Sequence, residues 1–164
     1  KLDFKILLNI IEKKSLYETN IAEKNKCNLI ISSKYLDYVQ IEKKLINNKI
    51  NQYIKNYYIP HPRTWKNSSY LLQTCVLVNS KNIESWIINN AFNFKEVFIG
   101  VSATTLIFAE LILLKKINMN LNLLVTDSFG TNNSKKELFS FIESAISSEA
   151  YKTIYFNGRL LKIK

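Results

Sequence analysis

The sequence predicts an α/β fold built on a doubly wound parallel sheet, with helices on both faces of that sheet. Short runs of Ile, Leu, Val and aromatic residues alternate along the chain with longer segments that have helical spacing. The short runs are apolar at successive positions, which is typical of strands that are buried on both faces. Strands that alternate with helices in this way build parallel sheets, so we expect one α/β layer sandwich.

The first 26 residues differ from the rest of the chain. Leu2, Ile6 and Ile10 lie near one helical face, and a polar link follows them. We therefore expect residues 1–26 to form an N-terminal helical connector and residues 27–164 to form the α/β domain.

The elements of this domain can be placed one by one. Strands are expected at Asn28–Ser32, Tyr57–Ile59, Cys75–Val78, Glu96–Val101, Leu121–Thr126 and Lys152–Phe156. Helices are expected at Val39–Lys55, Asn82–Asn90, Ala103–Lys116 and Lys135–Ser147. Ile41, Leu45 and Ile50 give the first of these helices its apolar face, and Pro60 ends the second strand because proline has no backbone N–H. An Asn-Gly turn and a basic tail are expected after the last strand.

Composition excludes several classes of protein. With 164 residues, 47% of them hydrophobic, the chain can bury one sizeable core, so a disordered chain is excluded. Two cysteines cannot support a disulfide scaffold, so we expect a reducing compartment and a cytoplasmic protein. The longest apolar stretch, Leu106 to Leu114, contains Glu110 and is shorter than the roughly 20 residues of a membrane span. The chain opens with Lys, so a fragment or processed product is expected.

The net charge of +10 indicates an anionic ligand or surface more than a nucleic acid. Lys, Ile and Asn dominate the chain, as AT-rich codons would favour, and the lysines form no single stripe. Arg63 and Arg159 are the only arginines, whereas a nucleic-acid-binding domain usually has several for bidentate contacts. A solvated surface, an anionic ligand and contact with an anionic inner membrane are left open, and no nucleic-acid partner is expected.

The sharpest motif is Ile59-Pro60-His61-Pro62-Arg63 at the end of the second expected strand. The two prolines stiffen the backbone around the only histidine of the chain. A stiff loop can hold an imidazole and a guanidinium beside a phosphate, where both make charge-assisted hydrogen bonds. The alternative is a turn whose histidine is merely exposed.

A second candidate lies where Gly100-Val101-Ser102-Ala103-Thr104-Thr105 joins a strand to a helix. Backbone N–H groups and hydroxyls at a helix start form an anion site. The alternative is that Ser102 is only an N-cap, which needs no ligand. Neither of the glycine-rich nucleotide-binding signatures, G-x-G-x-x-G and the Walker A loop, occurs in the chain.

Two carboxylates complete the set. Glu84 opens an expected helix and could accept hydrogen bonds from ribose hydroxyls, although acidic residues are common in first turns. Asp37 follows the first expected strand and could act as a general base, although a turn role is common there. All four features fall at the carboxyl edge of the expected sheet, where ligands of such sheets bind.

The order and spacing of these groups resemble the nucleotide-binding half of bacterial sialyltransferases of the glycosyltransferase family 52 type. Tyr58-Ile59-Pro60-His61-Pro62-Arg63 is similar to the family's His-Pro motif, and Ser102 with Thr104 and Thr105 is similar to its Ser/Thr-rich motif. The resemblance implies a Rossmann-like carboxyl-terminal domain of a two-domain glycosyltransferase of the GT-B type.

The same resemblance implies roles for the quoted residues. His61, flanked by Pro62 and Arg63, would contact the phosphate of CMP-sialic acid and aid the departure of CMP. Ser102 and a neighbouring Thr would bind phosphate, and Glu84 would hold the ribose or cytosine. Asp37 would deprotonate the acceptor hydroxyl, so that sialic acid is transferred with inversion. No metal and no cofactor are implied.

Partners follow from the resemblance as well. We expect a nucleotide-sugar donor, a glycan or lipooligosaccharide acceptor, and an amino-terminal domain outside this chain, without which transfer would be poor or absent. Residues 1–26 would connect to that domain or pack against a second subunit, so a homodimer is left open. The rival hypotheses are a non-catalytic nucleotide-binding or interaction module, another nucleotide-sugar glycosyltransferase, and a basic nucleic-acid-binding domain, against which the scarcity of arginine argues.

Overall fold

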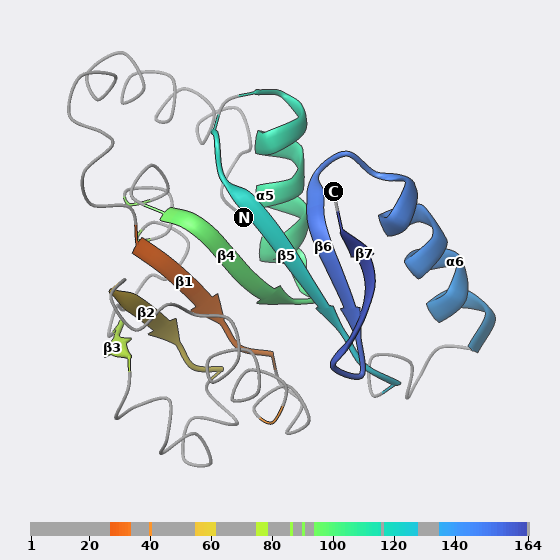
Figure 1. Cartoon of the computed structure of the whole chain (residues 1–164), viewed down its shortest axis with the longest axis horizontal. Helices are drawn as coiled ribbons and strands as arrows, with labels where there is room; N and C mark the ends of the chain where they lie inside the picture. The colour runs from red at the N-terminus through yellow and green to blue at the C-terminus, as the bar shows by residue number, and fades with distance from the viewer. Residues whose placement is uncertain are drawn as a thin grey trace.

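A computed structural model describes residues 27–33, 55–61, 75–78, 94–115, 117–127 and 135–163, together with Gln40, Trp86 and Asn90. Within these residues the chain is an α/β protein, with seven strands in one mostly parallel sheet and two helices (Figure 1). The strands are β1 (Cys27–Ile31), β2 (Asn56–Ile59), β3 (Val76–Leu77), β4 (Phe94–Gly100), β5 (Asn120–Val125), β6 (Tyr151–Phe156) and β7 (Arg159–Ile163). The helices are α5 (Ala103–Leu113) and α6 (Lys135–Ser147).

The strands lie in the order β3-β2-β1-β4-β5-β6-β7. Every neighbouring pair is parallel except β6 and β7, which are antiparallel. All six strands predicted from apolar runs are present, with ends that differ by up to two residues. β4 begins earlier than predicted, at Phe94, because a register shift pairs Cys27 with Phe94 and Asn28 with Glu96. The extra residue interrupts the alternation of side chains at the start of the strand.

The basic tail predicted after residue 156 is wrong, because Arg159–Ile163 forms β7. Asn157 (φ 49°) and Gly158 (φ 78°) both have positive φ, which gives a two-residue hairpin turn matched to the twist of the strands. The chain therefore turns back and pairs with β6. Lys162 donates from Nζ to the carbonyl oxygens of Ile146 and Ser148, so this lysine closes the end of α6.

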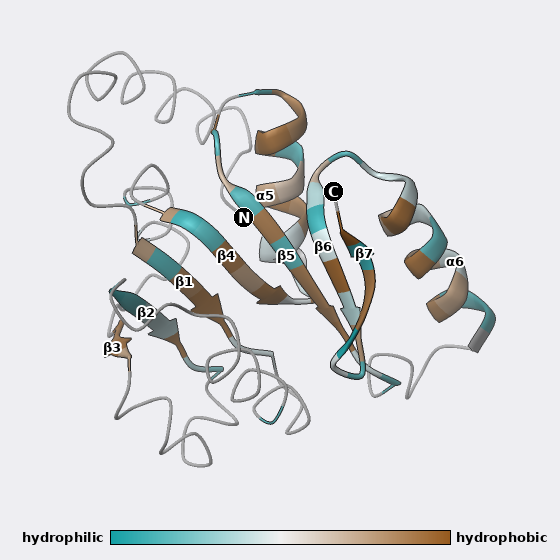
Figure 2. Cartoon of the chain, in the orientation of Figure 1, coloured by the Kyte–Doolittle hydropathy of each residue, from teal (hydrophilic) through white to brown (hydrophobic). Residues whose placement is uncertain are grey.

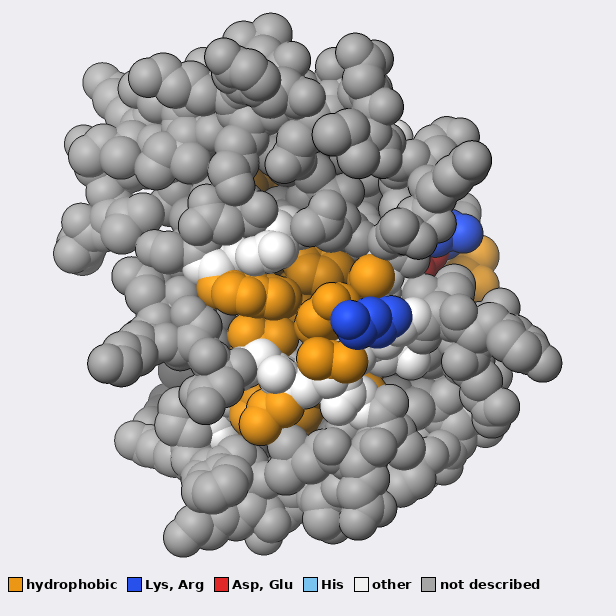
Figure 3. Space-filling view, turned by 90° about the vertical axis from the view of Figure 1, so that its left-hand side faces the viewer, with side chains coloured by type: hydrophobic (Ala, Val, Ile, Leu, Met, Phe, Trp, Pro, Cys, Tyr) orange, Lys and Arg blue, Asp and Glu red, His pale blue; other side chains and the backbone are white. Residues whose placement is uncertain are grey.

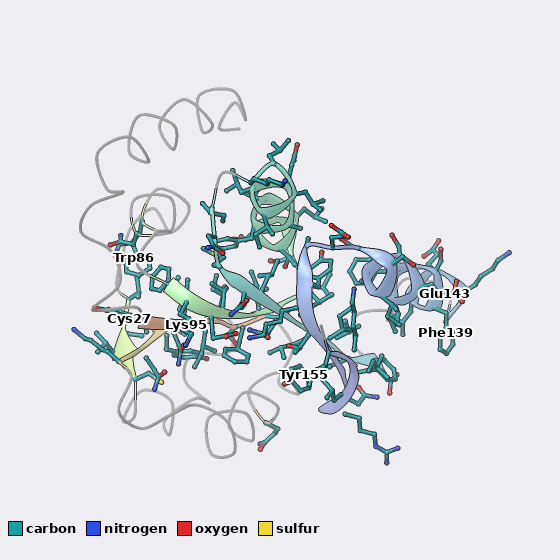
Figure 4. All side chains as sticks on the ribbon, turned by 45° about the horizontal axis from the view of Figure 1, so that its top comes forward. Cys27, Trp86, Lys95, Phe139, Glu143 and Tyr155 are labelled. Carbon is teal, nitrogen blue, oxygen red and sulfur yellow. The ribbon has the colours of Figure 1, made fainter. Side chains whose placement is uncertain are left out.

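One face of the sheet packs against both described helices. Leu29 of β1, Ile99 of β4 and Leu123 of β5 belong to the same buried cluster as Phe108 of α5 and Ile142 of α6. Because side chains of a strand alternate between faces, these strand residues define a single face, and α5 and α6 both cover it. In Figure 4, Phe139 and Glu143 lie on the outer side of α6, away from the sheet.

The opposite face of the sheet is buried as well. Ile30, Tyr58, Phe98, Leu124 and Tyr155 point to that side, and each is less than a tenth exposed. Burial on both faces explains why the strand segments are apolar at successive positions. Figure 2 shows this hydrophobic character along most of β1, β4 and β5.

Several predicted elements cannot be compared with the structure. The helical connector at 1–26 lies outside the described residues, and so do the helices predicted at 39–55 and 82–90, except that Gln40, Trp86 and Asn90 are helical. The helix predicted at 103–116 is present but ends at Leu113, and the helix predicted at 135–147 has the predicted bounds. Among the described helices, none has the length and apolar character needed to cross a membrane.

The sheet ends on one side at β3, whose Val76 and Leu77 are exposed. Figure 3 looks at that side of the molecule and shows apolar side chains at the surface there. Tyr57, Trp86 and Phe94 pack ring against ring near this side, with centroids about 6 Å apart.

A polar network joins three strands at the amino end of the sheet. One carboxylate oxygen of Glu96 accepts from Asn120 Nδ2 at 2.7 Å and from Lys152 Nζ at 3.0 Å, and the other accepts from Asn122 Nδ2 at 2.9 Å. Asn122 Oδ1 in turn accepts from the hydroxyl of Thr153. Because Asn122 and Thr153 are buried, these bonds satisfy groups that would otherwise destabilise the sheet.

We expect Glu96→Ala to lower the free energy of unfolding by about 2 kcal/mol, because it removes the acceptor shared by three donors. Urea denaturation of the full chain measures the change. Glu110→Ala, at an exposed position of α5, is the matched control and should change stability by less than about 0.5 kcal/mol. Equal midpoints for the two variants would show that the network contributes no stability.

Candidate functional site

The candidate site lies at the carboxyl edge of the sheet, where β1 and β4 are neighbours. The connection that leaves β1 runs to β2 on one side, whereas the connection that leaves β4 runs to β5 on the other. In open parallel sheets, ligands bind outside the carboxyl ends of strands at the point where neighbouring connections diverge. The strand order therefore gives a specific position to search for functional side chains.

The register shows which residues reach this edge together. Ile31 pairs with Ile59 of β2 on one side and with Ile99 of β4 on the other. The loop that holds His61 and the loop that holds Ser102 therefore leave the sheet at the same level. Since β1 lies between β2 and β4, the two loops are separated by two strand spacings, or about 10 Å.

Ser102 is the N-cap of α5, and its backbone is extended, with φ −162°. Its N–H donates to Thr105 Oγ1 at 3.1 Å, and Thr105 N–H donates to the Ser102 carbonyl oxygen at 3.1 Å. The Thr105 hydroxyl donates onward to the Gly100 carbonyl oxygen at 2.8 Å. Thr105 is 1% exposed, so its hydroxyl serves the turn that starts the helix.

The accessible hydroxyls at this helix start are those of Ser102 and Thr104. Ser102 is exposed and Thr104 is half-buried. The Ser102 hydroxyl lies 3.2 Å from Thr105 Oγ1, so the two hydroxyls are within hydrogen-bonding distance in the same turn. A phosphate could still approach Ser102 from solvent, so phosphate binding by these residues stays a prediction.

His61 follows Pro60 directly and is half-buried two residues beyond the end of β2. The end of β2, from which this loop leaves, is hydrogen-bonded to the residue that follows β1, because Ser32 N–H donates to the Ile59 carbonyl oxygen at 3.0 Å. The remaining predicted site residues, Asp37, Pro62, Arg63 and Glu84, lie outside the described residues.

Three further polar features lie at this edge, and the sequence assigned no role to any of them. Ser32 and Thr126 follow β1 and β5, and each has a buried hydroxyl without a hydrogen-bond partner. Asp127 and Asn157 are bonded reciprocally, since Asn157 Nδ2 donates to Asp127 Oδ2 at 2.7 Å and Asp127 N–H donates to Asn157 Oδ1 at 3.2 Å. The one available signal was a polar residue directly after a strand.

The described groups with displaced pKa values lie at the amino ends of strands. A hydrogen bond with Tyr57 raises the pKa of Lys55, whose Nζ is 5.1 Å from the centroid of that ring. Burial raises the pKa of Tyr151, the first residue of β6. These shifts belong to the packing of that edge and not to the candidate site. Among the described residues, no three His, Cys, Asp or Glu side chains gather as metal ligands.

Comparison of the chain with protein-family models, with curated proteins and with solved structures finds no match. The family resemblance suggested by the motifs therefore rests on the residues themselves.

The cap geometry predicts a stability difference between two threonines in the same turn. Thr105→Val should lower the free energy of unfolding by about 1–2 kcal/mol, because it removes the acceptor for Ser102 N–H and the donor to Gly100. Thr104→Val, the matched control, removes a hydroxyl that takes no part in the cap. Urea denaturation compares the two, and an equal loss of stability would contradict the role given to Thr105.

Proposed function

We propose that this chain is the carboxyl-terminal nucleotide-sugar-binding domain of a sialyltransferase-like glycosyltransferase, with CMP-sialic acid as the donor. The observation that carries the proposal is that His61 and Ser102, predicted independently from two motifs, leave the sheet at the same edge on either side of β1. The order β3-β2-β1-β4-β5-β6 supports, as part of the proposal, a doubly wound Rossmann-like sheet of the GT-B type.

The proposed phosphate site is built from two kinds of donor. The imidazole of His61 donates a charge-assisted hydrogen bond to a phosphate oxygen, and Arg63 adds its guanidinium. Across β1, the first turn of α5 offers backbone N–H groups and the Ser102 and Thr104 hydroxyls, at the positive end of the helix dipole. The net charge of +10 attracts an anionic donor to the protein.

The proposed reaction breaks the bond between the anomeric carbon of sialic acid and the phosphate oxygen of CMP. The acceptor hydroxyl attacks that carbon from the opposite face while Asp37 takes its proton, and CMP leaves with the bonding electrons. The transition state resembles an oxocarbenium ion, so donors that stabilise the leaving phosphate contribute most to rate. The proposal includes Glu84 and Pro62 as donor-binding residues and uses no metal or cofactor.

The proposed acceptor is a glycan of the lipooligosaccharide type, bound between this domain and an amino-terminal domain. Such a reaction would take place in the cytoplasm, and the proposal leaves open a peripheral contact with the anionic inner membrane. The proposal leaves open whether residues 1–26 join the two domains or contact a second subunit.

A second candidate is a nucleotide-binding or interaction module without catalytic activity. The cap geometry favours it, because the Ser102–Thr105 turn satisfies its own hydrogen bonds. The two candidates differ in what they predict once an amino-terminal domain is restored: the first hydrolyses or transfers from CMP-sialic acid, and the second only binds CMP.

Calorimetric titration of the chain with CMP, UDP and GDP tests the proposal. CMP should bind more tightly than either diphosphate, and His61→Ala should weaken CMP binding about tenfold because it removes a hydrogen bond to a charged group. Lys136→Ala, at an exposed position of α6, is the control for a lost positive charge and should bind CMP like the wild type. Binding of UDP in preference to CMP would favour a glycosyltransferase that uses another nucleotide sugar. If His61→Ala binds CMP as tightly as the wild type, His61 does not bind the phosphate.

A further inference from the structure

Ser32 carries a buried hydroxyl that nothing in the structure satisfies. The residue is 8% exposed, and its Oγ has no hydrogen-bond partner. A buried hydroxyl without a partner destabilises a protein, and most buried polar groups therefore have one. Exceptions call for an explanation, and functional sites are one place where they occur.

The backbone fixes the place of this hydroxyl. Ser32 N–H donates to the Ile59 carbonyl oxygen at 3.0 Å, so the parallel ladder between β1 and β2 continues through this residue. Since Ile31 pairs with Ile99, Ser32 comes level with Gly100 of β4. The alternation of side chains places Ser32 on the side of Ile30, and Gly100 has no side chain to fill the adjacent position.

Ser32 also lies between the two parts of the proposed phosphate site. It ends the strand between β2, which leads to His61, and β4, which leads to Ser102. A phosphate that touches both loops must pass over the end of β1. The candidate carboxyl-edge groups thus come from three adjacent strands, β2, β1 and β4, with Ser32 at the end of the middle strand. Its side chain is on the face of the sheet opposite to α5.

From this placement we propose that Ser32 is a phosphate-binding residue, whose hydroxyl donates a hydrogen bond to a phosphate oxygen of the nucleotide. The inference rests on the proposed function and adds a residue to it. The oxygen is covered in this structure, so the contact forms as the carboxyl edge adjusts around the ligand.

Thr126 is the matched control. Its Oγ1 is also buried without a partner, and the residue is 1% exposed. It follows β5, however, which lies on the far side of β4 from β1 and outside these three adjacent strands. Thr126→Val and Ser32→Ala therefore remove similar hydroxyls, of which only one is placed to reach the phosphate.

The test compares binding of CMP, of cytidine and of inorganic phosphate by calorimetry, together with urea denaturation. Ser32→Ala should bind CMP about tenfold more weakly, bind phosphate more weakly and bind cytidine as the wild type does, without loss of stability. Ser32→Thr, which keeps a hydroxyl, should retain most of the CMP affinity, and Thr126→Val should retain all of it.

Equal CMP affinity in the wild type and in Ser32→Ala would overturn the inference while leaving the proposed function intact. An equal loss of cytidine and CMP affinity would also overturn it, because the serine would then act through packing. A wild-type chain that binds no CMP would contradict the proposed function, and the role of Ser32 would fall with it. Should Ser32→Ala fail to fold, Ser32→Cys, which keeps the volume, gives the same comparison.

Discussion

The pairing of β1 with β4 is the constraint on which the rest of the structure depends. These two strands are central in the sheet, and Leu29, Ile30, Val97 and Ile99 in them are almost fully buried. They are neighbours in space although β2 and β3 lie between them in the chain. The connections that leave them therefore diverge, and the carboxyl edge between them is left for polar side chains. His61, Ser32 and Ser102 owe their common position to this pairing.

The two edges of the sheet hold different polar groups. At the amino edge, the Glu96 carboxylate accepts from three donors and links β4, β5 and β6. One atom near that edge, Asn28 Oδ1 of β1, is buried without a partner, as are the hydroxyls of Ser32 and Thr126 at the carboxyl edge. The Glu96 network contributes stability, whereas each unpaired group costs some. Burial without a partner therefore does not distinguish the carboxyl edge, and the case for Ser32 depends on its place between the strands that lead to His61 and Ser102.

The sequence predicted the strands and helices whose positions depend on the character of neighbouring residues. Apolar runs identified six strands, and the polar turn before Lys135 and the spacing after it gave the bounds of α6. The turn at Asn157 was predicted, but β7 was missed because Arg159 and Lys162 suggested a solvated tail. The bonds from Lys162 to the end of α6 are tertiary contacts that the sequence does not show.

The candidate site was predictable only in part. The motifs at His61 and Ser102 were visible as polar residues after apolar runs, but strand order, which brings their loops to one edge, depends on pairing between distant segments. Ser32 was visible only as a polar residue after an apolar run, because the lack of a partner for its hydroxyl is a property of the packed structure.

The central claim is that a cytidine nucleotide binds where β1 and β4 end. Amide chemical shifts of the ¹⁵N-labelled chain, followed during titration with CMP, test it directly. The account predicts that the amide chemical shifts of Ser32, His61 and Ser102 change as CMP is added. The amide chemical shifts of Glu96 and Lys152, at the amino edge, should not change. Shifts confined to the amino edge, or none at the ends of β1 and β4, would contradict it.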